Sequence, residues 1–302
     1  MIIDRLIEAI GALGNPTVAG LDTRIEHLPE SFQKRWDIGT AAGAAQAISA
    51  FNRSLIDALI DIVPCIKIQA ACYELYAEAG LSALRDTAGY ARSRGMLVIA
   101  DVKRGDIGST SAAYSAAWIG RCGGQPVFDA DFVTVNPYLG ADGIAPFLED
   151  CRRYDKGIFI LVKTSNPSSS ELQDLRLADG RAVYEAVADR VAVWGEGLTG
   201  SHGYSAAGAV VGATHPEQGA ALRRRMPGIF FLLPGYGAQG ATGADIVRMF
   251  DRERGGAIVN ASRSLLTAWR KRGTDDFASA ARDEAISMRE DIMGALGRVR
   301  YH

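Results

Sequence analysis

Short apolar runs alternate with longer segments of helical spacing along the whole chain. The runs, rich in β-branched residues, cover residues 17–22, 65–69, 96–103, 132–138, 157–165, 207–214, 229–235 and 257–262. Runs that are apolar throughout are typical of strands buried on both faces of a parallel sheet. Eight such strands, each followed by a helix, predict a closed (β/α)8 TIM barrel, and an open doubly wound sheet is the alternative.

Helical spacing of apolar residues fills the gaps between these strands. The predicted helices cover residues 41–62, 74–94, 109–120, 182–195, 216–225, 244–252 and 275–296. The stretches 24–40, 121–131, 166–180 and 198–205 are expected as loops or insertions, with a serine-capped turn entering a helix at 166–171. No Pro- or Ser-rich linker divides the chain, so residues 1–302 are expected to form a single domain with inserted loops.

Charge and hydropathy exclude two classes of partner. Lys and Arg number 33 against 35 Asp and Glu, so the formal net charge of −2 offers no basic field for nucleic acid. No window approaches the roughly 20 continuous apolar residues that span a bilayer. The first residues carry Asp4 and Glu8 and lack the order of a secretion signal. We therefore expect a cytoplasmic protein that binds neither nucleic acid nor membrane.

The four cysteines are too few and too scattered for a disulfide framework. They are Cys65, Cys72, Cys122 and Cys151, and none forms a C-x-x-C pair. We expect them to be small buried side chains in a reducing compartment.

Polar groups gather where the predicted strands end. They are Asp22, Lys67, Asp101, Lys103, Asn136, Lys163, Ser165, Thr214, residues 235–239, Asn260 and Arg263. Emergence of strands into water explains some of them, but Lys67 lies between apolar neighbours in the run CIKIQ. Because the carboxyl ends of barrel strands carry the active site, we expect the site at this face.

The densest cluster is Asp101-Val-Lys103-Arg-Gly-Asp106-Ile-Gly-Ser-Thr110, directly after the apolar run MLVIA. Side chains alternate along a strand, so Asp101 and Lys103 are expected on the same side. A lone pair of this kind is often a structural ion pair, and Asp106 could simply cap the next helix. The nearby charge of Lys67 favours a functional site, because buried charge is costly.

A glycine-rich segment follows the seventh predicted strand, Leu233-Pro234-Gly235-Tyr236-Gly237-Ala-Gln239-Gly240. It contains G-x-G-x-x-G, yet Asn260 stands where a dinucleotide fold requires an acidic residue. Small residues also let backbone N–H groups approach a phosphate, which barrels commonly bind after strands seven and eight. Arg263 can donate two hydrogen bonds to the same anion, or alternatively form a surface salt bridge.

These motifs together resemble the orotidine 5′-phosphate decarboxylase family. The resemblance rests on Asp101-x-Lys103-x-x-Asp106-Ile-x-x-Thr110, on Ala19-Gly20-Leu21-Asp22 before it and on Pro234-Gly-Tyr-Gly-Ala-Gln239-Gly after it. The segment Lys163-Thr-Ser165-Asn-Pro167 and the chain length resemble the longer bacterial branch. The resemblance implies a homodimeric TIM barrel that converts orotidine 5′-monophosphate to UMP and CO₂ in pyrimidine biosynthesis, without cofactor or metal.

The resemblance also implies a role for each matching residue. Lys67, Asp101, Lys103 and Asp106 form the charged network, and Asp106 and Thr110 reach into the neighbouring subunit's site. Asp22 holds ribose hydroxyls, Ser165 the pyrimidine amide, Gln239 both pyrimidine and phosphate, and Tyr236 and Arg263 the phosphate. Pro234 and Ser262 complete the substrate-binding set, with Ser262 standing where many relatives have glycine.

The chemistry of the implied reaction agrees with these residue types. Loss of CO₂ from the pyrimidine leaves electrons on C6 with no electron-sink cofactor, so fixed charge must stabilise them. Lys103 is suited to meet that charge and donate a proton, while Asp101 and Asp106 keep it ionised. Whether Asp101 also destabilises the substrate carboxylate stays open. Residues 235–243 and 166–180 are the candidate lids that close over the ligand.

Two other functions are compatible with a barrel of this kind. A metal-dependent sugar-phosphate decarboxylase or aldolase-like synthase would need additional acidic ligands beside Asp22 or Lys67, and the sequence offers none there. A phosphate-binding barrel without catalysis is disfavoured because all four charges of the network are present.

Overall fold

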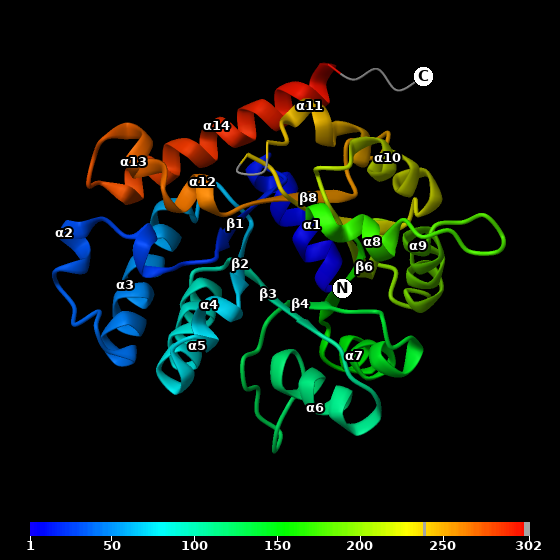
Figure 1. The fold of residues 1–302 in the computed structure, drawn as a ribbon, viewed down its shortest axis with the longest axis horizontal. Helices are drawn as coiled ribbons and strands as arrows, with labels where there is room; N and C mark the ends of the chain where they lie inside the picture. The colour runs from blue at the N-terminus through cyan, green and yellow to red at the C-terminus, as the bar shows by residue number, and fades with distance from the viewer. Residues whose placement is uncertain (238–239, 299–302) are drawn as a thin grey trace.

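The computed structural model describes residues 1–237 and 240–298 of the chain. In this part, parallel strands close in sequence order into a barrel, and Figure 1 shows helices arranged around it. The strands are β1 (Thr17–Leu21), β2 (Cys65–Gln69), β3 (Leu97–Arg104), β4 (Phe132–Val135), β5 (Gly157–Lys163), β6 (Ser205–Val211), β7 (Ile229–Pro234) and β8 (Ala257–Ala261). The predicted (β/α)8 barrel is confirmed, and the open sheet is wrong.

The barrel closes between its first and last strands. Thr17 pairs with Val259 and Val18 with Asn260, in parallel like every other neighbouring pair. All eight predicted strands are present, with ends that differ by a few residues; β6, for example, begins at Ser205 in a stretch expected to be a loop.

Helices precede β1, connect successive strands and follow β8, and most of them cover the outside of the barrel. The longer ones are α1 (Ile2–Leu13), α3 (Ala41–Leu59), α5 (Ala77–Ser93), α6 (Gly108–Trp118), α7 (Ala141–Tyr154), α9 (Val183–Trp194), α10 (Pro216–Arg225) and α14 (Phe277–Arg298). The shorter ones are η1 (Ile25–His27), α2 (Glu30–Gln33), α4 (Ala71–Glu74), η2 (Pro167–Ser169), α8 (Ser170–Gln173), α11 (Gly243–Ile246), η3 (Val247–Met249), α12 (Arg263–Leu266) and α13 (Ala268–Arg272).

Helix α7 is absent from the sequence-based prediction. Pro146 lies inside it, and a proline in a short segment normally argues against a helix. The buried residues Ile144, Phe147, Leu148 and Cys151 nevertheless follow the i, i+3, i+4, i+7 spacing of one helical face. This spacing is the signal that identifies the helix.

Two further local predictions are wrong. The continuous helix predicted at 244–252 is a single turn, α11, that passes into the 3-10 turn η3 and ends at Phe250. The turn at 166–171 does lead into α8, but Ser169 makes no capping bond, and its buried hydroxyl has no hydrogen-bond partner among the described residues. The stretches at 24–40 and 166–180 also contain short helices.

Helix α1 covers the end of the barrel where the strands begin. Its residues Ile2, Ile3 and Leu6 are buried, and Figure 1 places it at the centre of the ring of helices. The Ile2 N–H donates to Asp155, which precedes β5, and Asp4 accepts from the backbone of His202, which precedes β6. The opposite end, where the strands finish, is therefore not covered by α1.

Close packing fills the barrel itself. Phe132 and Phe159 lie with ring centroids 5.3 Å apart. A Cβ at Gly208 would stand 2.6 Å from the Phe230 carbonyl oxygen, so glycine is needed there for β6 to pack beside β7.

The described cysteines form no disulfide. Cys65, Cys72 and Cys151 are buried as expected, whereas Cys122 is exposed, contrary to the prediction. No helix in the described ranges has the length and apolar character to cross a membrane.

Candidate active site

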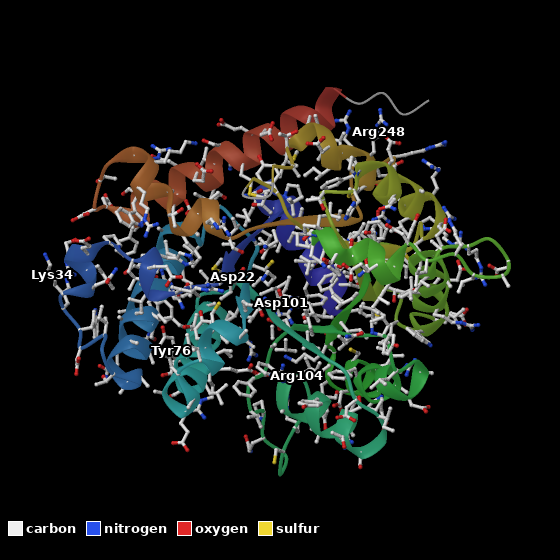
Figure 2. The ribbon with its side chains drawn as sticks, in the orientation of Figure 1. Asp22, Lys34, Tyr76, Asp101, Arg104 and Arg248 are labelled. Atoms are coloured by element: carbon white, nitrogen blue, oxygen red, sulfur yellow. The ribbon has the colours of Figure 1, made fainter. Side chains whose placement is uncertain are left out.

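Asp101 on β3 is the centre of a charge network at the carboxyl ends of the first three strands. Its Oδ2 accepts from Lys67 Nζ at 2.9 Å and from Gln69 Nε2 at 3.2 Å. Lys67, on β2 and only 3% exposed, also donates to Asp22 just after β1, at 3.1 Å. Figure 2 shows Asp22 and Asp101 near the middle of the barrel. The structure thus brings together three of the residues that the sequence singled out.

The buried charges of this network stabilise one another. Burial alone would raise the pKa of Asp101, but the positive charges of Lys67 and Lys103 outweigh it and hold that pKa well below its ordinary value. Burial would likewise lower the pKa of Lys67, yet the carboxylates of Asp101 and Asp22 raise it above the ordinary range. The stabilisation from both shifts is complete between about pH 4 and pH 10, and is lost as pH falls through the folded pKa of Asp101 or rises through that of Lys67.

Removing the charge of Lys67 is expected to destabilise the fold. Lys67→Met keeps much of the side-chain volume but leaves the Asp101 carboxylate with one less buried partner, which lowers the free energy of unfolding by about 3 kcal/mol. Lys271→Met, in an exposed ion pair with Glu284, is the matched control and should change it by less than about 0.5 kcal/mol. Urea unfolding at pH 7 measures the free energy of unfolding of both variants. If Lys67→Met lowers it no more than Lys271→Met does, the buried pair adds nothing to stability.

Lys103 reaches the same carboxylate from the outer side. Its Nζ donates to Asp101 Oδ1 at 2.5 Å, while 45% of its side chain stays exposed. The predicted contact between Asp101 and Lys103 is therefore present. The backbone at Lys103 has a φ of 48°, so this part of β3 departs from the regular alternation on which the prediction was based.

Asp106 and Thr110 do not join this network within the chain. Asp106 accepts only from the adjacent Ile107 N–H and forms no salt bridge with any residue that the structure describes. It does not cap α6 either, since no side chain caps that helix. Thr110, in the first turn of α6, is exposed.

The ends of β7 and β8 lie side by side and bring Pro234 close to Asn260 and Ser262. Pro234 pairs with Asn260 in the barrel register, and Asn260 Nδ2 donates to Ser262 Oγ at 3.2 Å. A Cβ on Gly20 of β1 would lie 1.9 Å from Ser262 Oγ, so only glycine allows this approach. Arg263, the first residue of α12, is exposed beside them.

Tyr236 is directed toward α14. Its hydroxyl donates to Asp291 Oδ2 at 2.7 Å, and both residues line a cavity of about 420 Å³ that also borders Lys271 and Arg272. Burial, followed by the bond to Asp291, raises the pKa of Tyr236. A phosphate contact from this hydroxyl requires the Asp291 bond to break. Gln239, predicted to bridge pyrimidine and phosphate, lies outside the described residues.

Ser165 follows β5 at the same end of the barrel. Its carbonyl accepts from Thr214 Oγ1, just after β6, at 3.2 Å.

The neighbouring Lys163 is fully buried and donates to Asp174 at 2.8 Å, which ties the stretch 166–180 to the barrel. Lys163, the last residue of β5, therefore has a structural partner in the stretch that follows its strand.

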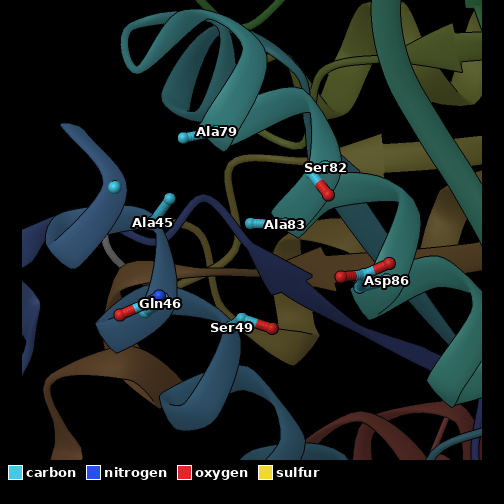
Figure 3. Close-up of a pocket in the computed structure, with 8 residues that line it drawn as sticks. Ala45, Gln46, Ser49, Ala79, Ser82, Ala83 and Asp86 are labelled. Atoms are coloured by element: carbon cyan, nitrogen blue, oxygen red, sulfur yellow. The ribbon is translucent and has the colours of Figure 1, made fainter.

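A second cavity, of about 300 Å³, lies between α3 and α5 (Figure 3). Small side chains line most of it, including Ala45, Ala79 and Ala83, and Asp86 is its charged group. It is set among the outer helices and contains none of the predicted site residues, so we do not assign it to the active site.

Two polar residues of the network were missed by the sequence analysis. Gln69 donates to Asp101 from the end of β2, and Thr134 does so from within β4 at 2.9 Å. Thr134 is the polar residue of the otherwise apolar strand FVTV, the same signal that marked Lys67, and Gln69 ends the strand CIKIQ that contains Lys67.

The barrel and its charge network define a class of protein. Paired lysines and aspartates at the carboxyl ends of β1, β2 and β3 are typical of the active site of a (β/α)8-barrel enzyme.

Comparisons with known proteins specify the family. The family model described as orotidine 5′-phosphate decarboxylase / HUMPS matches residues 44–274. An orotidine 5′-phosphate decarboxylase of Clostridium acetobutylicum is 41% identical, over 98% of this chain and 100% of that protein. One of Caldicellulosiruptor saccharolyticus is 40% identical, over 97% and 98%. The solved Leishmania donovani OMP decarboxylase is similar with a TM-score of 0.72 and 30% identity, covering 95% of this chain and 98% of its own. The chain belongs to the orotidine 5′-phosphate decarboxylase family.

Proposed function

We propose that this enzyme converts orotidine 5′-monophosphate to UMP and CO₂ without a cofactor, with Lys103 as the proton donor. The observation that carries the proposal is the chain of charges from Asp22 through Lys67 and Asp101 to Lys103, which ends in a partly exposed ammonium group. An ammonium held in this way can stabilise negative charge and also supply a proton.

The reaction follows from these groups. The bond between C6 and the carboxylate carbon breaks, CO₂ leaves, and the electron pair stays on C6. Lys103 Nζ then gives a proton to C6, and water restores the proton on the amine. Asp101 holds the ammonium in place and, through its low pKa, stays ionised across the working pH range.

The remaining residues are proposed to hold the substrate. Asp22 contacts the ribose hydroxyls, Ser165 the pyrimidine amide, and Pro234, Tyr236, Gln239, Ser262 and Arg263 the phosphate end of the ligand. The support is the place of the described members of this set at the carboxyl ends of β1, β5, β7 and β8, where barrel enzymes bind phosphorylated substrates.

We also propose that two chains form a dimer in which Asp106 and Thr110 complete the partner's site. Asp106 is half-buried and has no counter-charge within the described chain, so its carboxylate is available to a cation of a second chain. Large apolar side chains are exposed in the segments that follow β2, β3 and β4, namely Leu75, Ile107, Tyr138 and Leu139. Exposed apolar side chains of this size are the kind that a subunit interface covers.

A direct assay tests the proposed function. Addition of orotidine 5′-monophosphate to EDTA-treated protein should give the ultraviolet absorbance change of UMP formation at the same rate as untreated protein. The described residues contain no group of three or more His, Cys, Asp or Glu side chains that could hold a metal ion. Loss of turnover on EDTA treatment, restored by Mg²⁺, would favour the metal-dependent alternative; binding without turnover would favour a non-catalytic barrel.

Arg263 is expected to contribute to substrate affinity. Loss of a charge-assisted hydrogen bond to phosphate should weaken binding of the substrate by about 1.5 to 3 kcal/mol, which raises KM in Arg263→Ala by about 10-fold or more. Arg248→Ala, in an exposed pair with Glu217, is the control and should leave KM unchanged. An unaltered KM in Arg263→Ala would remove this residue from the phosphate site.

A further inference from the structure

Strand β3 does not pair regularly with β4 at the point where the charge network lies. The pairing passes from Ala100 opposite Val133 to Arg104 opposite Val135. Three residues of β3, 101–103, therefore face the single residue Thr134 of β4. A bulge of this kind redirects a side chain but leaves backbone groups without their usual ladder partners.

The hydroxyl of Thr134 replaces those partners. Its Oγ1 accepts from the N–H groups of Val102 and Lys103, both at 3.0 Å, and donates to Asp101 Oδ1 at 2.9 Å. A hydroxyl has one donor and two acceptor positions, so all its hydrogen-bonding capacity is used. Thr134 is 1% exposed, so water does not compete for these bonds.

This one hydroxyl touches both ends of the contact between Asp101 and Lys103. It binds the backbone N–H of Lys103, whose φ of 48° is unusual for a residue other than glycine. It also binds the same Oδ1 of Asp101 that accepts from Lys103 Nζ. Thr134 thus fixes both the backbone from which the Lys103 side chain extends and the Asp101 carboxylate that orients its ammonium.

We propose that Thr134 is a positioning residue for the amine of Lys103. The proposal rests on the proposed role of Lys103 as proton donor and assigns Thr134 no contact with substrate. The bulge places the ammonium, and Thr134 holds the bulge. An error of about 1 Å in the position of a reacting group costs about 100-fold in rate, so the effect of losing this hydroxyl falls on the chemical step.

Thr134→Val tests the proposal, because valine has nearly the same shape and strand preference but makes none of the three bonds. We expect kcat to fall about 100-fold, while KM and the Kd for UMP stay within about twofold of those of the parent protein. Thr134→Ser keeps the hydroxyl and should recover most of the lost kcat. Thr17→Val is the matched control: Thr17 is equally buried on β1, and its hydroxyl has no partner among the described residues. Its kcat should not change.

Hydrogen exchange provides a measurement that does not depend on turnover. The Val102 and Lys103 amides should exchange at least about 10-fold faster in Thr134→Val than in the parent or in Thr17→Val. If the parent protein fails to decarboxylate orotidine 5′-monophosphate, the proposed function is wrong, but this exchange result still decides whether Thr134 holds the bulge. Unchanged exchange, or a kcat within about twofold of the parent, overturns the proposal. The proposal is also overturned if Thr134→Val loses both kcat and UMP binding and Thr134→Ser restores neither, since that pattern indicates general structural damage.

Discussion

Lys103→Ala should abolish nearly all decarboxylation while leaving the ligand-binding site intact. The variant lacks both the positive charge that meets the C6 carbanion and the proton that ends the reaction, so kcat should fall by about 10⁴-fold or more. The proposed phosphate and ribose contacts come from other strands, so the Kd for UMP should change little. Single-turnover absorbance assays and calorimetric UMP binding measure the two quantities separately.

An exposed lysine away from the site provides the control for this variant. Lys34 lies just beyond α2, and Figure 2 shows it at the edge of the molecule, far from Asp101. Lys34→Ala should keep the full rate. If Lys103→Ala decarboxylates like the parent, the assigned proton donor is wrong; if it loses UMP binding in parallel, Lys103 acts in binding rather than in the chemical step.

Mixed dimers should recover activity that neither parent variant possesses. Lys103→Ala and Asp106→Ala each inactivate every site of their own homodimers. A hybrid contains one site with both residues native, because Asp106 is proposed to act in the partner's site. At equal concentrations and with random exchange in a two-fold dimer, half of the dimers are hybrids and about a quarter of all sites are native. Activity should therefore rise from near zero to about a quarter of that of the parent protein.

Exchange of chains between the two variant dimers must be shown independently before the recovered activity can be interpreted. Differently tagged chains that copurify after mixing establish that hybrids exist. Mixing Lys103→Ala with Asp101→Ala serves as the negative control, since both residues belong to the same chain's network and each hybrid site lacks one of them. Confirmed hybrids without activity would contradict a shared site.

The regular part of the fold could be predicted from local pattern. Buried parallel strands are apolar along their whole length, so all eight were visible in the sequence; their number favoured a closed barrel, and the pairing of β1 with β8 shows the closure. Helix α7 was missed because Pro146 obscured an otherwise regular buried face. The helix predicted at 244–252 is instead α11 followed by η3; these two short elements pack against α14 and α10, contacts that no local window of sequence shows.

The site was predictable where its residues carry unusual chemistry in an apolar strand. Lys67 and Asp101 were found in this way, and their contact is present. The contact of Lys103 with Asp101 was also expected, but the bulge that produces it depends on pairing with β4, about 30 residues further along the chain. Thr134 carries the signal of a polar residue in an apolar strand, but its role exists only once β3 and β4 are paired, so the sequence does not indicate what it does.

A crystal structure of the protein with bound UMP would show whether Lys103 can protonate C6. We expect Lys103 Nζ within about 3.5 Å of C6 of the pyrimidine, the distance at which a proton can pass between them. We also expect the carboxylate of Asp106 of the partner subunit beside that ammonium. A Lys103 amine turned into solvent, or more than about 6 Å from the ring, would show that Lys103 is not the proton donor.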